Sequence, residues 1–301
     1  MIKYLLVAVA LGLAMASTAS NASNEFRPSF SPDGRYLAFH SDRDGDNEIY
    51  RLDLQTGEIL QLTNNDVDDA DPDYSPDGQY IAFYSGDNSA SSVFMMPGSG
   101  GEQMRLTSDT ERAIVPVWSP DGSEIYFQKS VNGSWEFHAV RVDDKSTRKV
   151  SSMPGDHLSI TFFPDSDRLL FSHVQPGESH DVPLRLYSMN TDGSDIQAFM
   201  AHAGGDSNPQ FSPDGSRIVF NALRDLNYEI YIMDSDSGNQ RRLTHDNTPE
   251  LSFDFPTIDG QPTWSPDGSA IAFTSGRKGE FDIYLINPES GWLINLTGHW
   301  Q

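Results

Sequence analysis

A five-residue phrase, an aromatic residue followed by Ser-Pro-Asp-Gly, recurs along the chain and restricts its fold more than any other feature. Complete copies begin at Phe30, Tyr74, Trp118, Phe211 and Trp264, and a worn copy reads Phe162-Phe163-Pro164-Asp165. The aspartates stand at positions 33, 77, 121, 165, 214 and 267, so the steps are 44, 44, 44, 49 and 53 residues. Self-similarity with such a period is typical of an architecture built from repeated supersecondary units.

Each repeat has the pattern of a small four-stranded sheet. Ser-Pro-Asp-Gly suits a tight turn, because Pro presets φ, Asp bonds its own backbone and Gly accepts a positive φ. A short apolar run reaches a phenylalanine six residues after every aspartate. A third aromatic follows sixteen or seventeen residues after the aspartate, or twenty-two in the fourth repeat. Four copies end in Leu-Thr thirty residues after the aspartate. The pattern predicts an all-β fold, a six-bladed β-propeller with four antiparallel strands per blade.

We expect the propeller to occupy residues 21–301, with blades at about 26–63, 70–107, 114–151, 158–200, 207–244 and 260–297. Three aromatic slots per blade take 18 of the chain's 33 aromatic residues, which indicates that the rings join neighbouring blades rather than stack on bases. The third slot holds Tyr50, Phe94, Phe137, Tyr187, Tyr231 and Tyr284. The repeats start and end in phase, so each blade is expected to be complete in itself. The alternative is that residues around Ala22–Phe26 add a strand to the sixth blade.

Residues 1–20 differ from the rest and indicate a secretory signal peptide. Lys3 gives a positive start, an apolar core runs from Tyr4 to Met15, and small residues follow. The core is too short for a permanent membrane anchor. We therefore expect cleavage near Ala16, Ala19 or Ala22. The mature protein is expected to be periplasmic or secreted, to be a monomer and not to insert stably into a membrane.

The charge balance narrows the partners. The formal charge is −24, with 44 acidic residues against 20 basic ones, which argues against nucleic acid and anionic membranes. The negative charge fits either a solvated surface of an exported protein or attraction to cations or to a basic partner.

Residues 41–48 lack the glycine placement and the flanking helices of an EF-hand, whereas the aspartate-rich residues 64–73 fit either a calcium site or a hydrated loop. Cysteine is absent, so blade packing alone must hold the fold.

Function is expected where the connections between blades gather around the axial channel. Residues six and eight before each turn aspartate should approach that mouth, and they are mostly polar, unlike the uniform rows behind them. The predicted ligand-binding rim is Arg27, Asp69, Asp71, His157, Asp206, Asn208, Asp259 and Gln261. The same two rows also contain Glu25, Ala113, Val115 and Ser159. The alternative is a rim that is merely hydrated.

Two departures from the 44-residue period fall at the same end. Blade four carries five extra residues within 172–183, and the connection from blade five to blade six carries nine within 245–260. The second insertion contains a candidate lid, which either folds over the channel mouth or packs against a blade: Leu251, Phe253 and Phe255. Three histidines on successive connections are candidate ligands for a transition metal, the alternative being exposed loop histidines: His157, His202 and His245. No cofactor is expected, and calcium or manganese remains an option.

Repeats of the form Pro-x-aromatic-Ser-Pro-Asp-Gly-x-x-Ile-Ala-Phe, then Glu-Ile-Tyr-x-x-Asp and Leu-Thr, resemble the WD40-like repeats of the TolB-like propeller family over about residues 26–297. The resemblance implies a periplasmic component of the Tol–Pal system, although the N-terminal α/β domain of TolB has no counterpart here. Related repeats occur in prolyl oligopeptidase-like peptidases and in oligogalacturonate lyase, where channel histidines and a glutamine hold manganese. The sequence contains no Gly-x-Ser-x-Gly motif, which argues against a peptidase.

Two functions follow from these observations. The favoured one is a non-catalytic binding or scaffold module for a protein or glycan ligand of the cell envelope, because the repeats account for nearly the whole chain after residue 20. The alternative is a metal-dependent lyase or hydrolase that acts on acidic oligosaccharides.

Overall fold

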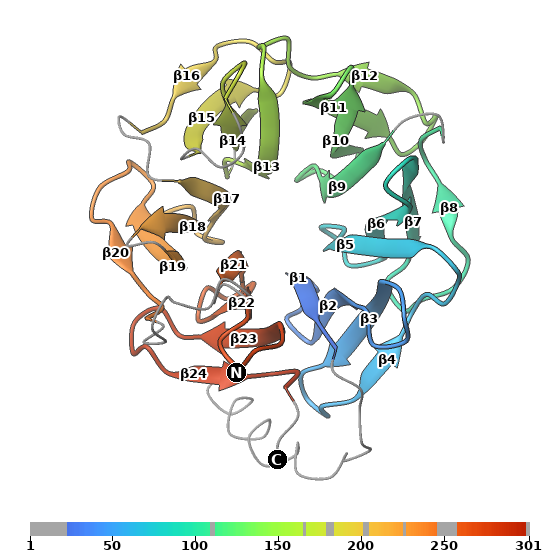
Figure 1. Cartoon of the computed structure of the whole chain (residues 1–301), viewed down its shortest axis with the longest axis vertical. Coiled ribbons are helices and arrows are strands. Elements are labelled where there is room, and N and C mark those ends of the chain that lie inside the picture. The colour runs from blue at the N-terminus through green and yellow to red at the C-terminus, as the bar shows by residue number, and fades with distance from the viewer. Residues whose placement is uncertain are drawn as a thin grey trace.

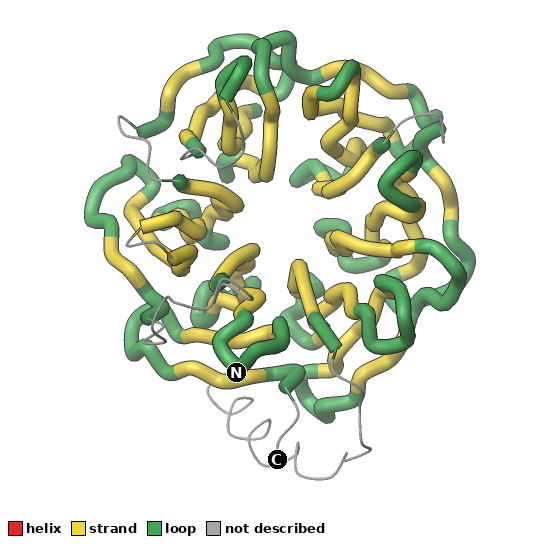
Figure 2. The backbone as a smooth tube through the Cα atoms, viewed as in Figure 1, coloured by secondary structure: helices red, strands yellow, loops and turns green. Residues whose placement is uncertain are grey.

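The computed structural model describes residues 23–108, 112–164, 167–178, 184–200, 205–224, 227–245 and 258–298. In these residues 24 strands form six four-stranded sheets, arranged as blades around a central axis (Figures 1 and 2), and no helix occurs. The predicted fold class is confirmed. The predicted signal peptide lies outside the described residues. The part of the chain that is described contains no helix long and apolar enough to span a bilayer.

The strands follow one another in chain order, four to a blade. They are β1 (Glu25–Phe30), β2 (Tyr36–Ser41), β3 (Glu48–Asp53) and β4 (Ile59–Gln61); β5 (Asp68–Tyr74), β6 (Tyr80–Gly86), β7 (Ser91–Pro97) and β8 (Met104–Arg105); β9 (Ala113–Trp118), β10 (Glu124–Val131), β11 (Ser134–Arg141) and β12 (Thr147–Lys149); β13 (Asp156–Phe162), β14 (Arg168–Val174), β15 (Arg185–Asn190) and β16 (Gln197–Ala198); β17 (Asp206–Phe211), β18 (Arg217–Arg224), β19 (Asn227–Asp234) and β20 (Arg241–Arg242); β21 (Asp259–Trp264), β22 (Ile271–Ser275), β23 (Asp282–Ile286) and β24 (Leu293–Asn295).

Every blade is an antiparallel meander whose first strand lies nearest the axis and whose fourth strand lies at the circumference (Figure 1). This order places the connections between blades, and those from second to third strands, on one face of the disc, which we call the loop face. The Ser-Pro-Asp-Gly turns lie on the opposite, turn face. Both insertions noted in the sequence fall between strands that meet at the loop face, β14 with β15 and β20 with β21.

The turns form the hydrogen bonds that their residue types predict. In the first blade, Gly34 N–H donates to the carbonyl of Ser31 (2.8 Å), and Ser31 Oγ donates to Asp33 Oδ1 (2.6 Å). Asp33 Oδ1 also accepts the N–H of Arg35 at 3.0 Å, and Gly34 has a φ of 69°. The serine–aspartate bond recurs in the turns of the second, third, fifth and sixth blades.

The core consists of six apolar clusters, one in each contact between neighbouring blades, which we call a seam. The phenylalanines six residues after the aspartate are at most 2% exposed: Phe39, Phe83, Phe127, Phe171, Phe220 and Phe273. Burial of each such ring contributes about 2–3 kcal/mol of gross stabilisation. The aromatic slots therefore join the blades, as the sequence predicts.

One aromatic of the third slot joins its blade to a different neighbour from the others. In five blades the buried phenylalanine pairs across the sheet with the third-slot aromatic, as Phe39 does with Tyr50. In the third blade Phe127 pairs with His138, and Phe137 lies one residue earlier in the strand. Successive residues of a strand face opposite sides. Phe137 therefore packs into the seam with the fourth blade, against Phe171.

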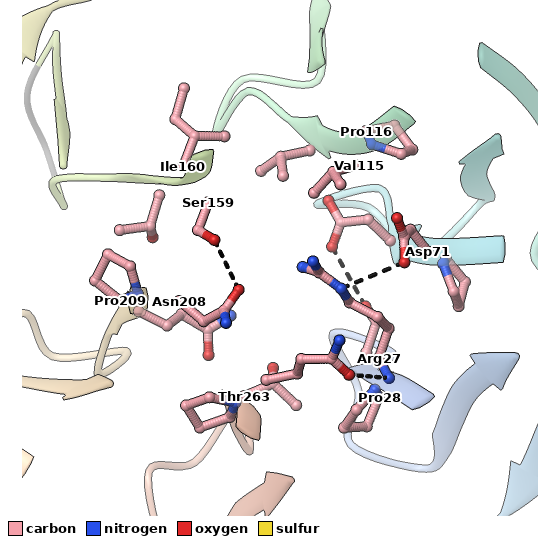
Figure 3. A pocket seen from close by; sticks show the side chains of 18 residues that line it. Arg27, Pro28, Asp71, Val115, Pro116, Ser159, Ile160, Asn208, Pro209 and Thr263 are labelled. Carbon is pink, nitrogen blue, oxygen red and sulfur yellow. Dashed lines mark hydrogen bonds and ion pairs between the residues drawn. The ribbon is translucent and has the colours of Figure 1, made fainter. Parts of the chain in front are cut away.

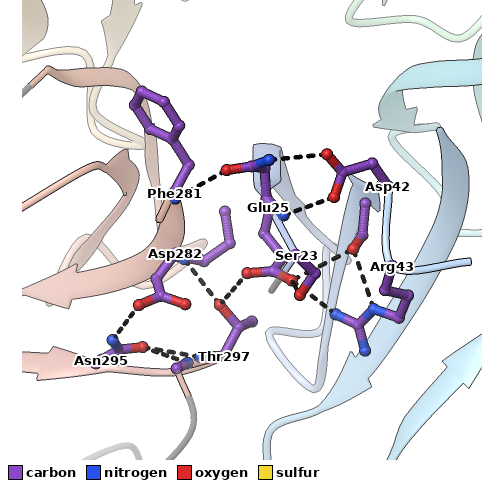
Figure 4. Close-up of polar contacts among 12 residues, drawn as sticks. Ser23, Glu25, Asp42, Arg43, Phe281, Asp282, Asn295 and Thr297 are labelled. Atoms are coloured by element: carbon purple, nitrogen blue, oxygen red, sulfur yellow. Dashed lines mark hydrogen bonds and ion pairs between the residues drawn. The ribbon is translucent and has the colours of Figure 1, made fainter. Parts of the chain in front are cut away.

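The ring closes without exchange of strands between blades. Strand β1 pairs with β2, and β24 pairs with β23, so the first and sixth blades are each complete. The two blades are joined by hydrogen bonds from Glu25 N–H to the Phe281 carbonyl (2.7 Å) and from Thr297 Oγ1 to Glu25 Oε2 (3.3 Å) (Figure 4). Phe281 N–H also donates to Asn24 Oδ1 at 3.3 Å. The in-phase closure is confirmed, and no added strand is found among the described residues, which begin at Ser23.

Candidate functional site

One residue from the first strand of each blade adopts a left-handed backbone and lines the channel. These residues, which we call the axial ring, have φ values from 47° to 55°: Arg27, Asp71, Val115, Ser159, Asn208 and Gln261. Each lies at a shift of register between the first and second strands, which is a β-bulge. A left-handed non-glycine residue costs about 1–3 kcal/mol, and such strain gathers at functional sites.

The axial ring and the two residues after each member enclose a cavity of about 130 Å³ (Figure 3), which we call the axial cavity. Its walls include five prolines and one isoleucine directly after the ring: Pro28, Pro72, Pro116, Ile160, Pro209 and Pro262. A water molecule occupies about 30 Å³ in the liquid, whereas pockets for small molecules measure about 300–1,000 Å³. The cavity therefore has the size of a side chain, and a second hollow of about 330 Å³ shares Asp73, Val117, Thr161 and Gln210 with it.

Charged groups occupy one side of the axial cavity. Arg27 Nε lies 3.3 Å from Asp71 Oδ1, and the two side chains are 26% and 13% exposed. Asp71 N–H donates to His40 Nδ1 at 3.2 Å, so His40 carries its proton on Nε2. Burial lowers the pKa of His40 to about 4, despite the neighbouring Asp71 carboxylate. The imidazole that contacts Asp71 is therefore neutral at neutral pH.

Neutral polar groups occupy the other side. Ser159 Oγ donates to Asn208 Oδ1 at 2.8 Å, and Asn208 Nδ2 donates to Asn221 Oδ1 at 2.9 Å. Gln261 Oε1 accepts the N–H of Arg27 at 3.0 Å and the hydroxyl of Thr274 at 3.2 Å. The axial ring thus has charged groups on one side of the channel and neutral polar groups on the other.

The row eight residues before each turn aspartate lies in the seams, not on the channel. Its polar members are at most 1% exposed: Glu25, Asp69, His157, Asp206 and Asp259. Three of these carboxylates are ion-paired with arginines of their own blades, Glu25 with Arg43 (3.0 Å), Asp206 with Arg224 (2.9 Å) and Asp259 with Arg277 (2.6 Å). In a regular strand, residues six and eight before the aspartate would have their side chains on the same face. The left-handed residue at the bulge turns the axial-ring side chain away from that face, so one row lines the channel and the other lies in the seams.

The candidate metal ligands have other surroundings. His157 is buried, with Nδ1 3.2 Å from the Trp135 carbonyl and Nε2 3.1 Å from Ser151 Oγ, and burial lowers its pKa to about 4. His245 is exposed, and His202 lies outside the described residues. The candidate lid, Leu251, Phe253 and Phe255, also lies outside them. Within the described ranges, no three His, Asp or Glu side chains are grouped so as to hold a metal ion.

Asp73 is a cavity residue that the sequence reasoning missed. Its carboxylate accepts the N–H of Trp118 at 2.9 Å and the hydroxyl of Ser29 at 3.3 Å, so it joins three consecutive blades. Burial raises the pKa of Asp73 to about 6, against these two hydrogen bonds. The pattern Asp71-Pro72-Asp73 was the available signal, since the row four residues before the turn aspartate also lines the cavity.

The six blades and their axial ring define the chain as a six-bladed β-propeller built from Ser-Pro-Asp-Gly repeats. Its sequence matches the TolB beta propeller domain over residues 9–193, 140–254 and 203–300. The chain belongs to this family.

Individual relatives are similar over short stretches. An uncharacterized protein of Agrobacterium fabrum is 36% identical over 87 residues, which cover 29% of this chain and 27% of the relative. The Tol-Pal system protein TolB of Desulfosudis oleivorans is 34% identical over 85 residues, which cover 28% of this chain and 17% of the relative. The matched stretches therefore span less than a third of these relatives.

Solved structures show the same fold at low identity. TolB from Acinetobacter baumannii superposes with a TM-score of 0.70 at 16% identity, covering 94% of this chain and 65% of that one. An oligogalacturonate lyase in complex with manganese superposes with a TM-score of 0.59 at 18% identity, covering 90% and 92%. At these identities the likeness shows the fold alone.

Proposed function

We propose that the protein is an exported, non-catalytic binding or scaffold propeller that takes a protein or glycan partner of the cell envelope at the loop-face mouth of its channel. One observation carries the proposal. The six members of the axial ring share one backbone conformation, yet all six are different amino acids. The buried phenylalanines, by contrast, are the same in every blade. A uniform scaffold that presents six unlike side chains toward one axis is suited to recognise a partner in one orientation.

The surroundings of the acid–base groups support binding rather than catalysis. His40 accepts a backbone N–H, Asp73 accepts a backbone N–H and a hydroxyl, and His157 is held in a seam. Each of these groups stabilises the scaffold and is engaged before any ligand arrives. Family membership and the TolB relative from Desulfosudis oleivorans support a role in the envelope, and the leader-like residues 1–20 support export.

A channel-blocking variant tests the proposal. Ser159→Arg places a long side chain in the axial cavity, and Gln55→Arg, on an exposed turn, makes the same change of charge elsewhere. Each tagged protein is incubated with envelope extract and with a glycan array, and bound proteins are identified by mass spectrometry. We expect a partner that is retained by the wild type and Gln55→Arg and lost from Ser159→Arg. Equal retention by all three proteins would refute binding at the channel.

The competing function is a metal-dependent lyase or hydrolase acting on acidic oligosaccharides, because the fold is shared with an oligogalacturonate lyase. Elemental analysis of protein purified without added metal, together with an ultraviolet assay for unsaturated products from oligogalacturonate, separates the two. Stoichiometric manganese with turnover would replace the binding proposal, whereas metal-free protein without turnover supports it.

A further inference from the structure

We infer that the axial cavity receives a carboxylate, the side chain of an aspartate or glutamate on a protein partner, and that the Arg27 guanidinium holds it. The inference rests on the proposed function, since it names the group that the partner inserts. It begins with the distribution of charge. Of the 18 residues that line the cavity, Arg27 alone is basic and Asp71 and Asp73 are acidic, in a chain with a formal charge of −24.

The guanidinium of Arg27 is only partly engaged. An arginine carries five N–H donors in a planar fork that matches the two oxygens of a carboxylate. The shortest contact of Arg27 with Asp71 is made by Nε, at 3.3 Å, which is longer than the 2.7–2.9 Å of a strong charged hydrogen bond. Among the described residues, the Nη groups have no hydrogen-bond partner. Figure 3 shows them directed toward the middle of the ring of side chains.

A second donor lies in the same ring. Gln261 Oε1 accepts two hydrogen bonds, from Arg27 N–H and from Thr274 Oγ1, which fixes the orientation of the amide. Its Nε2 group therefore remains available as a donor. Val115 and the surrounding prolines supply apolar walls, and in such surroundings a charged hydrogen bond is stronger than in water.

The size of the cavity selects the source of the carboxylate. A volume of about 130 Å³ matches a carboxymethyl or carboxyethyl group and is smaller than the roughly 300–1,000 Å³ of typical small-molecule pockets. The occupant is thus a projecting acidic side chain of a protein loop, and a uronic acid is the alternative to be tested.

Small probes test the inference directly. The full-length processed protein is titrated with N-acetyl-aspartate N-methylamide, its asparagine counterpart, methyl galacturonide and methyl galactoside, and binding is followed by NMR chemical shifts. We expect the aspartate probe to bind at least tenfold more tightly than the asparagine probe and than either sugar. Arg27→Gln should weaken the aspartate probe at least tenfold. Arg35→Gln, an exposed arginine paired with Asp53, should leave it unchanged.

Two further variants test the roles of the guanidinium fork and of Asp71. Arg27→Lys keeps the charge without the fork, so it should weaken the aspartate probe several-fold, and it replaces Arg27→Gln if that variant does not fold. Asp71→Asn removes the internal competitor for the guanidinium, so it should bind the aspartate probe more tightly. Weaker binding by Asp71→Asn, or equal binding of the aspartate and asparagine probes, would overturn the inference. Tighter binding of methyl galacturonide than of the aspartate probe would show that the carboxylate belongs to a glycan partner and not to a protein.

The partner-capture assay separates this inference from the proposed function. If Ser159→Arg loses the partner and Arg27→Gln retains it, binding at the channel stands and the carboxylate inference fails. If both variants retain the partner, both fail. Loss from both variants, with the aspartate preference of the small probes, supports both.

Discussion

The replacement Glu48→Gln tests whether a buried, protonated carboxyl in a seam makes the stability of the protein depend on pH. The side chain is fully buried between the first and second blades, where Oε1 accepts Asn65 N–H at 2.5 Å and Oε2 accepts the hydroxyl of Thr63. The carboxyl of Asp69, also fully buried, is within hydrogen-bonding reach, and Asp46 adds further negative charge. Burial, with these carboxylates adding to it, raises the pKa of Glu48 to about 7.

The size and sign of the effect follow from this pKa. An increase from the ordinary 4.5 to about 7 corresponds to about 3 kcal/mol of preference for the protonated carboxyl in the folded state. The folded protein holds this proton more tightly than the unfolded chain does. The stabilisation is therefore fully present below the ordinary pKa and is lost as the pH rises through the folded pKa. Burial raises the pKa of Glu25 to about 7 and that of Asp73 to about 6, and both act in the same direction.

Urea unfolding at about pH 5 and about pH 8 measures the effect. The free energy of unfolding of the wild type should fall between the two pH values. Glutamine cannot ionise, so Glu48→Gln should show a fall that is smaller by about 2–3 kcal/mol. Glu58→Gln, at an exposed turn, should follow the wild type. A Glu48→Gln protein with the pH dependence of the wild type would refute the assignment of a shared, protonated carboxyl pair to this seam.

Two further predictions concern packing. Phe220→Ala should lower the free energy of unfolding by about 3–5 kcal/mol, because the ring is fully buried in a seam; Leu60→Ala, at a side chain that is 43% exposed, should change it by no more than about 0.5 kcal/mol in the same urea assay. Gly78→Ala should destabilise more than Gly291→Ala. Their φ values are nearly equal, 71° and 72°, but only at Gly78 would the new Cβ meet another blade, 3.2 Å from Pro32 Cδ. Equal losses would show that the turns do not support one another across the seam.

The fold was predictable because five of the six turns have the same Ser-Pro-Asp-Gly residues and all six blades have the same buried phenylalanine. The turn needs its serine, proline, aspartate and glycine, and each seam needs a buried ring. The Leu-Thr ending has an equally local cause, since Thr63 Oγ1 accepts the N–H of Ile49, and Thr244 and Thr297 make the same bond in their blades. Counting along the chain does not say which neighbouring blade Phe137 contacts, because one residue of register changes the face of the strand.

The candidate site was only half predictable, for a related reason. Residues six and eight before the aspartate share a face in a regular strand, so the sequence alone joins them into one rim. The bulge separates them, and a left-handed residue other than glycine has no distinctive sequence signal. The seam carboxylates did carry one, since Glu25, Asp206 and Asp259 each precede an arginine by eighteen residues: Arg43, Arg224 and Arg277.

The backbone of the axial ring itself favours a role for its side chains. Glycine adopts a positive φ without steric cost, and the chain uses it so at its turns, as at Gly34 and Gly78. At the axial ring, by contrast, all six blades carry a side chain in the left-handed conformation. Glycine there would relieve the strain but leave the axis without chemistry. The packing of the seams offsets the backbone strain of the axial ring. In return, six different side chains are directed toward one channel.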